Sequence, residues 1–219
     1  MLSPKLLSSP GSETHLLCLG AHCDDIEIGC GATLLYLLDE NPNIKVTWVV
    51  FASTPERKSE AELGASLFTK KAKQLELRIL TYRDGFLPTE AARLKDDFER
   101  LKREIPAPDL IFTHYRNDLH QDHRAVSDLT WNTFRDQLVL EYEIPKWDGD
   151  LGNPNAFLSI PAEMGQEKIA NLQRAYNSQK TKKWFTDDLF WSLMRIRGME
   201  CNSPSTLAEA FYSRKLLLS

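Results

Sequence analysis

The sequence lacks several features that would place it in a specialised class of protein. No stretch approaches the roughly 20 consecutive apolar residues of a membrane-spanning helix. Only 4 of the 219 residues are cysteine, too few and too scattered for a disulfide framework. The formal net charge of −4 gives no general electrostatic reason to bind nucleic acid or an anionic membrane. We therefore expect no membrane span and no nucleic-acid partner, and the cysteine usage favours a reducing, cytoplasmic setting.

The N-terminal segment also lacks the apolar run that a secretory signal peptide needs. Residues 1–14 combine one lysine with serines and prolines, so we predict a flexible tail there. The remaining residues, 15–219, carry no internal repeat and no linker-like composition. With 42 % hydrophobic residues they can bury one full core, and we predict a single domain.

What the sequence does contain is an alternation of strand-like and helix-like segments. Short connections between repeated strand–helix units are typical of a parallel sheet covered by helices on both faces. We therefore predict an α/β fold, a single-domain Rossmann-like three-layer structure with a mostly parallel sheet. The predicted strands are residues 15–21, 44–51, 76–81, 109–113, 138–144, 156–160 and 208–218, and the predicted helices are residues 30–38, 89–104, 124–136, 161–176 and 186–197, with one more that opens at Thr54 and Pro55.

Histidines and acidic residues gather directly after three of the predicted strands. They lie in residues 22–25, 83–84 and 114–123. In an open α/β sheet, ligands bind beyond the carboxyl ends of the strands. We therefore expect these three loops to converge on one edge of the sheet, although they are far apart in sequence.

The residue types in these loops are those of a hydrolytic metal site. A catalytic zinc ion keeps three protein ligands, commonly histidine and carboxylate, and leaves one position for water. The neighbours Asp24 and Asp25 would point in different directions from an extended turn, so one could bind metal while the other accepts a proton. Alone, such an acidic pair is more often a solvated turn, and His120 with His123 is a weak signal. Their joint occurrence after neighbouring strands favours a metal site.

Two motifs carry a resemblance to a known family. Residues 21–33, AHCDDIEIGCGAT, and residues 117–124, NDLHQDHR, resemble the paired signatures of the LmbE-like, or PIG-L-like, zinc-dependent N-deacetylases. Weaker likeness lies at Arg57–Ala61, Asp84–Leu87 and Ala208–Phe211. The resemblance implies an enzyme that removes the acetyl group from N-acetylglucosamine-type sugars.

The resemblance also implies a role for each motif residue. His22, Asp25 and His123 would bind zinc. Asp24 would be the general base that activates water. His120 would be a protonated, cationic group that stabilises the tetrahedral oxyanion and protonates the leaving amine.

Other residues are candidates for supporting roles. Asp122 would orient His120 by a hydrogen bond. Arg57 and Asp84 are candidates for substrate binding, although a surface arginine and a turn-capping aspartate are equally good interpretations. Residues that would support a ligand or reach the site are Asp118, Arg197 and Glu209.

The sequence departs from the usual family pattern at three positions. Cys23 and Gln121 stand where prolines are common, and Ile26 stands where many members carry glutamate, with Glu27 following it. None of these changes removes a ligand. A thiol beside His22 could bind metal or oxidise, but we expect it to point away.

The leading hypothesis is a metal-dependent hydrolase that removes the N-acetyl group from an N-acetylated amino sugar or its conjugate. Zn²⁺ is the expected cofactor, and other divalent metals suit the same ligands. One alternative is a non-catalytic nucleotide-binding Rossmann module, although Gly29-x-Gly31 lacks the full dinucleotide fingerprint. A second is a different metal hydrolase such as a phosphoesterase. The sequence leaves open the group joined to the sugar and the formation of a homo-oligomer.

Overall fold

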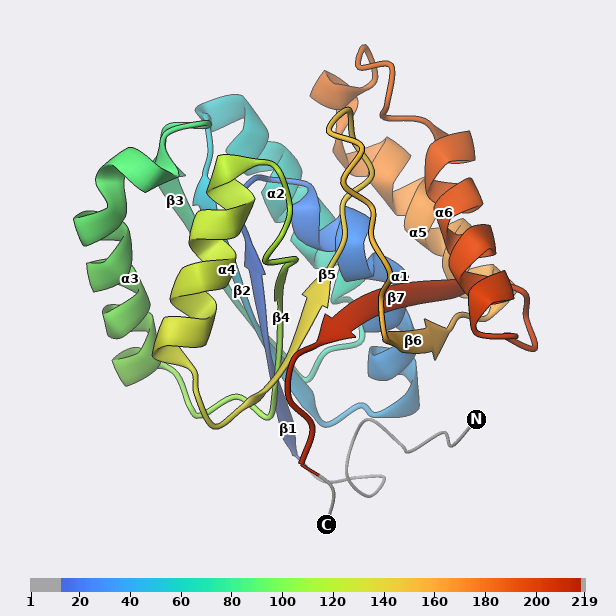
Figure 1. The fold of residues 1–219 in the computed structure, drawn as a ribbon, viewed down its shortest axis with the longest axis horizontal. Coiled ribbons are helices and arrows are strands. Elements are labelled where there is room, and N and C mark those ends of the chain that lie inside the picture. Colours follow the sequence, from blue (N-terminus) through green and yellow to red (C-terminus); the bar gives the residue numbers. More distant parts are fainter. Residues whose placement is uncertain (1–12, 218–219) are drawn as a thin grey trace.

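The computed structural model of the chain, which describes residues 13–217, is built on a seven-stranded sheet (Figure 1). Its strands are β1 (Thr14–Gly20), β2 (Ile44–Ala52), β3 (Gln74–Tyr82), β4 (Leu110–His114), β5 (Leu138–Tyr142), β6 (Ala156–Ser159) and β7 (Ala208–Ser213). Across the sheet they lie in the order β3-β2-β1-β4-β5-β7-β6. The first five strands in this order are parallel, whereas β7 is antiparallel to both β5 and β6. The predicted mostly parallel sheet is confirmed.

Helices cover both faces of this sheet, which gives the predicted three layers. The helices are α1 (Asp25–Glu40), α2 (Pro55–Phe68), α3 (Ala91–Glu104), α4 (Gln121–Thr133), α5 (Ala162–Ala175) and α6 (Asp187–Glu200), with short 3-10 turns η1 (Leu87–Glu90) and η2 (Asn177–Gln179). Figure 1 shows α3 and α4 on one face and α1, α2 and α5 on the other. No helix in residues 13–217 is long and apolar enough to cross a membrane.

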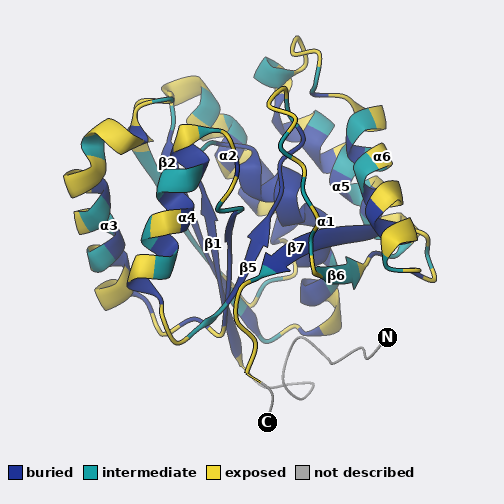
Figure 2. Ribbon diagram, viewed as in Figure 1, coloured by how far each residue is buried: buried dark blue, intermediate teal, exposed yellow. Residues whose placement is uncertain are grey.

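Two apolar cores follow from the alternation of side chains along the strands. On β2, Trp48 faces the core beneath α1 and α2, whereas Phe51 faces the core beneath α3 and stacks on Phe98 with ring centroids 5.0 Å apart. The central strands are therefore buried on both faces (Figure 2), as expected of a parallel sheet. The helix predicted to open at Thr54 does so, because the Thr54 hydroxyl accepts a hydrogen bond from the Arg57 amide (3.3 Å) and Pro55 takes the first position.

Several predicted boundaries were wrong by a few residues. Helix α1 begins at Asp25 instead of residue 30, and Cys30 has non-helical φ and ψ of −143° and 19° that kink it. Helix α4 begins at Gln121 instead of residue 124, so it includes His123 in its first turn. Strand β7 ends at Ser213 instead of residue 218. The first two shifts matter, because they put two candidate ligands on rigid helix starts instead of loops.

The predicted N-terminal tail lies mostly outside the described residues. Thr14 already belongs to β1, where it is aligned with Ile44 of β2. Glu13 forms ion pairs with Lys45 (2.7 Å) and Lys73 (2.8 Å). Residues 13 and 14 therefore belong with the domain that we predicted to begin at residue 15.

The order of the strands also fixes where a ligand would bind. After β1 the chain continues to β2 on one side, whereas β4 lies on the other side of β1. A crevice forms at such a reversal, outside the carboxyl ends of the strands. The loops that follow β1 and β4 are the two that carry the sequence motifs.

Candidate metal centre

The two motif loops meet at the carboxyl ends of β1 and β4. The Ala21 amide donates a hydrogen bond to Nε2 of His114 (2.9 Å), which joins the two strand ends. Next to this contact, the His22 amide donates to Oδ2 of Asp25 (2.6 Å), and Asp25 opens α1. His123 reaches the same place from the first turn of α4. Residues about 100 positions apart in sequence thus share one buried cluster.

The three candidate ligands converge on one another. Nδ1 of His22 lies 3.2 Å from Nε2 of His123 and 3.3 Å from Oδ2 of Asp25. Oδ1 of Asp25 lies 3.5 Å from Nε2 of His123. Tetrahedral ligands held about 2.0–2.1 Å from a zinc ion are about 3.3 Å from each other. The three residues therefore have donor chemistry that suits a metal ion, and their pairwise distances, which use both oxygens of Asp25, are close to this spacing.

Carboxylates on the far side of each imidazole orient the rings. Nδ1 of His123 lies 2.8 Å from Oδ2 of Asp118, which leaves Nε2 facing the cluster. Nε2 of His22 lies 3.1 Å from Oδ1 of Asp84 and 3.3 Å from Oδ2 of Asp122, which leaves Nδ1 facing the cluster. Metal-binding histidines almost always donate their second N–H to such a partner. The arrangement fits two histidine ligands that bind through different ring nitrogens.

The charged groups of the cluster favour a positive charge at its centre. Burial and the neighbouring His114 lower the pKa of His123 to about 3, so this ring is neutral. Burial works against a charged His22, but Asp25 and Asp122 raise its pKa well above the ordinary value. Burial also works against a charged Asp25, yet the surrounding imidazoles hold its pKa well below the usual range. A proton on His22 supplies the required charge, and a bound cation would replace it.

Asp24 lies beside the cluster and is held by an arginine. Its Oδ2 is 3.0 Å from Nη2 of Arg57, whose Nη1 contacts Glu60 (2.9 Å) and Ser178 (3.2 Å). Burial raises the pKa of Asp24, and Arg57 opposes this effect. Although Asp24 precedes α1, its side chain does not cap the helix. The guanidinium predicted to bind substrate therefore already orients the predicted base.

The predicted link between Asp122 and His120 is corrected by the structure. The Asp122 carboxylate accepts hydrogen bonds from the amides of Gly85 (2.6 Å) and Leu87 (3.1 Å) and lies beside His22. Among the described contacts, it is the Asp122 amide that donates to Nδ1 of His120 (3.3 Å). Burial and the neighbouring His22 lower the pKa of His120. These two observations favour a neutral His120 ring in this structure, and its predicted cationic role stays a prediction.

Asp84 combines a contact to the cluster with exposure to solvent. Its side chain is 78 % exposed, and the hydrogen bond with His22 lowers its pKa. Its neighbour Gly85 has a φ of +83°, a conformation that glycine adopts at little cost. The turn that contains this positive φ positions the Gly85 amide to donate a hydrogen bond to the Asp122 carboxylate.

Two partners hold the Asp118 carboxylate, and the sequence did not predict one of them, Lys146. Its Oδ1 lies 2.9 Å from Nζ of Lys146 and accepts a hydrogen bond from the His120 amide (2.8 Å). Burial works against its ionisation, but His123 and Lys146 lower its pKa. Lys146 lies in the loop after β5 and also contacts Asp150 (2.8 Å). No motif marks this lysine, so no sequence signal could have found it.

His114 lies behind the cluster instead of in its open part. It is fully buried, its ring stacks on that of His123 with centroids 3.9 Å apart, and its Nε2 lies 3.2 Å from Oδ2 of Asp25. It packs against His123 and Tyr142 and accepts a hydrogen bond from the Ala21 amide. Among the described residues, three groups bring one ligand atom of each member within 4.8 Å of the others, and the predicted set is divided between the first two: Asp25 with His114 and His123, His22 with His120 and His123, and His22 with Asp84 and Asp122.

Glu209 belongs to a second, separate cluster. Its carboxylate accepts hydrogen bonds from the amides of Ala32 (3.1 Å) and Thr33 (2.7 Å), just beyond the kink in α1. Lys168 binds Oε1 of Glu209 (2.6 Å) and the carbonyl of Ile28 (2.5 Å). The pair thus satisfies backbone groups that the kink releases. Glu209 supports the fold of α1 and does not reach the candidate ligands.

Arg197 also lies away from the candidate ligands. It makes a bidentate contact with Glu143 (2.7 and 2.8 Å) and binds Glu200 (2.8 Å) and the carbonyl of Gly152 (3.1 Å). These contacts tie α6 to the segment that follows β5. Among the described partners of Arg197, none is a candidate ligand.

Cys23 points away from the cluster, as expected. Its thiol donates to the carbonyl of Ala52 (3.5 Å), and burial raises its pKa to about 12. A protonated, buried thiol is a poor metal ligand and reacts slowly. All four cysteines are free.

Comparisons with known proteins identify the family of this chain. The family model described as "PIG-L: GlcNAc-PI de-N-acetylase" matches residues 17–134, more than half of the chain, and includes both motifs. A curated relative, the uncharacterized deacetylase YaiS of Escherichia coli (strain K12), is 29 % identical over 184 residues, which cover 80 % of this chain and 97 % of that protein.

Solved structures share the fold at lower identity. The N,N'-diacetylchitobiose deacetylase of Pyrococcus horikoshii is 21 % identical with a TM-score of 0.69, covering 91 % of this chain and 83 % of its own. The 4-carboxy-2-hydroxymuconate hydratase GalB of Pseudomonas putida KT2440 is 14 % identical with a TM-score of 0.71, covering 94 % and 98 %. Because a hydratase shares the fold, the fold alone does not define the reaction. The match that spans both motifs does define the family, and this chain belongs to the PIG-L family of deacetylases.

Proposed function

We propose that the protein is a metal-dependent de-N-acetylase that acts on an N-acetylated amino sugar or a conjugate of one. The observation that carries the proposal is the convergence of His22, Asp25 and His123 at distances of 3.2–3.5 Å. Family membership supports the deacetylase reaction. Zinc is the ion that two imidazoles and one carboxylate favour, and other divalent ions suit the same donors.

The residues around the cluster provide the remaining chemistry of amide hydrolysis. A divalent ion held by the three ligands would act as a Lewis acid on the acetyl carbonyl and lower the pKa of water. Asp24, with its raised pKa, would accept a proton from the attacking water and then deliver it to the leaving amine. Arg57 holds Asp24 in place for both transfers.

His120 would stabilise charge instead of supplying the proton. Its Nδ1 accepts the Asp122 amide, so the neutral ring carries its hydrogen on Nε2. A neutral imidazole that gave up this hydrogen would become an unfavourable anion. As a hydrogen-bond donor, however, it can stabilise the oxyanion that develops on the acetyl group.

The first turn of α1 disfavours the nucleotide-binding alternative. A Rossmann module places a pyrophosphate at this helix N-terminus, where amide groups and the helix dipole attract anions. Here the turn is acidic, with Asp25 and Glu27 in it and Asp24 before it. These carboxylates would repel a phosphate group.

The proposed substrate class has support from a structural neighbour, the diacetylchitobiose deacetylase. Asp84, which is exposed and next to the cluster, remains our candidate for a sugar hydroxyl. For Arg57 the contact with Asp24 makes a positioning role the better proposal. A cytoplasmic location stays a prediction from the cysteine usage.

Release of acetate from a panel of substrates tests the proposal. The panel contains N-acetylglucosamine, diacetylchitobiose, UDP-N-acetylglucosamine and aryl N-acetylglucosaminides, with an aryl phosphate for comparison. We expect acetate release that chelator removes and added zinc restores. Metal-loaded protein that deacetylates no member would contradict the substrate class, and faster hydrolysis of the phosphate ester would favour a phosphoesterase.

A further inference from the structure

Strand β3 is a long, open edge of the sheet. It is nine residues long, and within the described residues it pairs only with β2. The opposite edge, β6, has only four residues. An edge strand presents unpaired backbone N–H and C=O groups, and short strands are one way in which proteins protect such edges. Of the two edges, β3 is the one that offers a long pairing surface.

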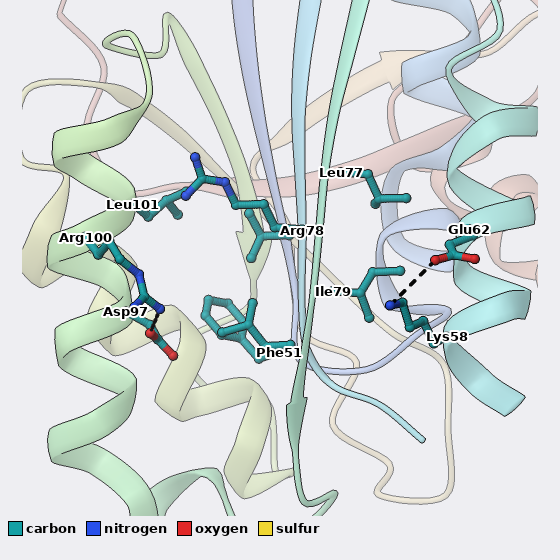
Figure 3. Close-up of a pocket in the computed structure, with 11 residues that line it drawn as sticks. Phe51, Lys58, Glu62, Leu77, Arg78, Ile79, Asp97, Arg100 and Leu101 are labelled. Atoms are coloured by element: carbon teal, nitrogen blue, oxygen red, sulfur yellow. Dashed lines mark hydrogen bonds and ion pairs between the residues drawn. The ribbon is translucent and has the colours of Figure 1, made fainter. Parts of the chain in front are cut away.

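A hollow of about 410 Å³ runs along this edge between α2 and α3 (Figure 3). Leu77 and Ile79 line it on the α2 side, and Phe51 and Leu101 line it on the α3 side. Ion pairs stand at its rim, Lys58 with Glu62 on α2 and Arg100 with Asp97 on α3. The lining therefore combines apolar side chains with Arg78, and charged pairs stand at the border, as at the rim of a protein interface.

The two faces of β3 differ in chemistry. Leu75, Leu77 and Ile79 alternate along the face toward α2, where they are only partly buried against the core. Glu76 and Arg78 point to the face toward α3 and contact each other (2.7 Å). One face of the strand thus carries a row of partly buried apolar side chains. The other face carries one acidic and one basic side chain.

We propose that β3 pairs with β3 of a second copy of this chain, antiparallel and centred on Leu77. A two-fold axis perpendicular to the sheet keeps every side chain on its own face, so residues that lie opposite each other must come from the same face. The axis therefore passes between the two copies of one residue, and that residue defines the register. Centring on Leu77 places Glu76 opposite Arg78 of the second copy, and Arg78 opposite Glu76. It also places Leu75 opposite Ile79 on the apolar face.

Neighbouring registers are electrostatically worse. Centring on Glu76 would place the two Glu76 carboxylates opposite each other, and centring on Arg78 would do the same with two guanidinium groups. Like charges directly opposite destabilise a strand pair, whereas opposite charges and apolar pairs stabilise it. Charge complementarity therefore selects a second copy in one register. The two sheets would become continuous, and both metal centres would stay open because they lie at β1 and β4.

Charge reversal tests the pairing. Sedimentation velocity at tens of micromolar should show a dimer for the wild type and a monomer for Glu76→Arg, because the introduced guanidinium would then face Arg78 of the other copy at two places. The double variant Glu76→Arg/Arg78→Glu should restore the dimer, which separates lost pairing from lost folding. Glu163→Arg, an exposed residue on α5, is the matched control and should remain dimeric. A monomeric wild type, or a dimer that Glu76→Arg leaves intact, would overturn the proposal.

Cross-linking tests the register. In a Cys201→Ser background, oxidised Leu77→Cys should form a covalent dimer, because opposite Cα atoms about 4.5–5.5 Å apart can form a disulfide. Ile79→Cys should not cross-link, because the two copies of residue 79 would be about 13 Å apart along the strands. Efficient cross-linking through residue 79, or none through residue 77, would contradict pairing centred on Leu77.

Discussion

Two buried clusters of charged residues contact α1, one at its kink and one at its N-terminus, and they are built differently. In the cluster of Lys168 and Glu209, each charged group binds the other and also a backbone group of α1. In the cluster of His22, Asp25 and His123, hydrogen-bonding atoms face one another around a common point. In the first cluster the two charges balance each other, whereas the second cluster needs a positive charge at its centre.

This difference separates residues that support the fold from residues that support chemistry. A buried ion pair is tolerated when hydrogen bonds satisfy its remaining atoms, and Lys168 with Glu209 meets that condition. The candidate metal site instead uses its outer hydrogen bonds to orient two imidazoles toward one point. Substitutions in the two clusters should therefore affect different measurements.

The largest expected effect is on turnover, in Asp24→Asn. Loss of the proton acceptor should lower kcat by about 10²–10⁴-fold, while the three ligands keep the metal. Kinetics with elemental analysis of the same sample measures both. Asp96→Asn, an exposed aspartate on α3, is the control and should match the wild type. Loss of metal from the Asp24 variant would mean that the roles of Asp24 and Asp25 are exchanged.

The next effect is on stability, in Lys168→Met. Removing the lysine leaves the Glu209 carboxylate buried with its charge unpaired, which should cost about 3–5 kcal/mol of unfolding free energy. Denaturant unfolding measures this loss, with the exposed Lys180→Met as control. The folded variant should keep the metal content of the wild type. A variant that is stable but loses metal would place Lys168 in the site.

A smaller effect is expected on metal affinity, in Asp118→Asn. An amide accepts the His123 N–H less strongly than the carboxylate, so the ring should be held less firmly. Loss of such a partner typically weakens metal binding about 10–100-fold. Competition with a chromophoric chelator measures the Kd. Asp148→Asn, whose carboxylate is 3.7 Å from Lys146, is the control, and an equal loss there would indicate a general charge effect.

The architecture of the site could be predicted from sequence because parallel strands impose it. Apolar runs identify β1 and β4, and residues just after parallel neighbouring strands must meet at one edge. That reasoning brought His22 and His123 together without knowledge of any side chain. It needed only the period of the strands and the lengths of the connections.

The tautomers and the supporting partners could not be predicted in the same way. Which ring nitrogen of His22 faces the cluster depends on Asp84 and Asp122, which arrive from different loops. Lys146 reaches Asp118 from a loop that has no periodic pattern. The role of Glu209 depends on the kink in α1, which the sequence does not mark as a break. These features follow from tertiary packing, which local patterns do not record.

The smallest expected effect concerns His15, the one histidine that is neither in the cluster nor packed against it. Its Nδ1 lies 3.0 Å from the Pro106 carbonyl and its Nε2 lies 2.8 Å from the Thr47 hydroxyl, contacts that suit a neutral ring. Burial lowers its pKa in the folded protein. The unfolded chain therefore binds more protons below about pH 6.5, and stability is lost as the pH falls through that range.

His15→Gln isolates this contribution, because an amide offers one donor and one acceptor and does not titrate. Between about pH 7.5 and 5.5 the wild type should lose more unfolding free energy than the variant, by at most about 1.4 kcal/mol per pH unit. Denaturant unfolding in excess chelator measures the difference and removes the pH dependence of metal binding. Equal slopes for the two proteins would show that folding does not change the pKa of His15, and the contrast between this neutral structural histidine and the metal-ligand cluster would then be lost.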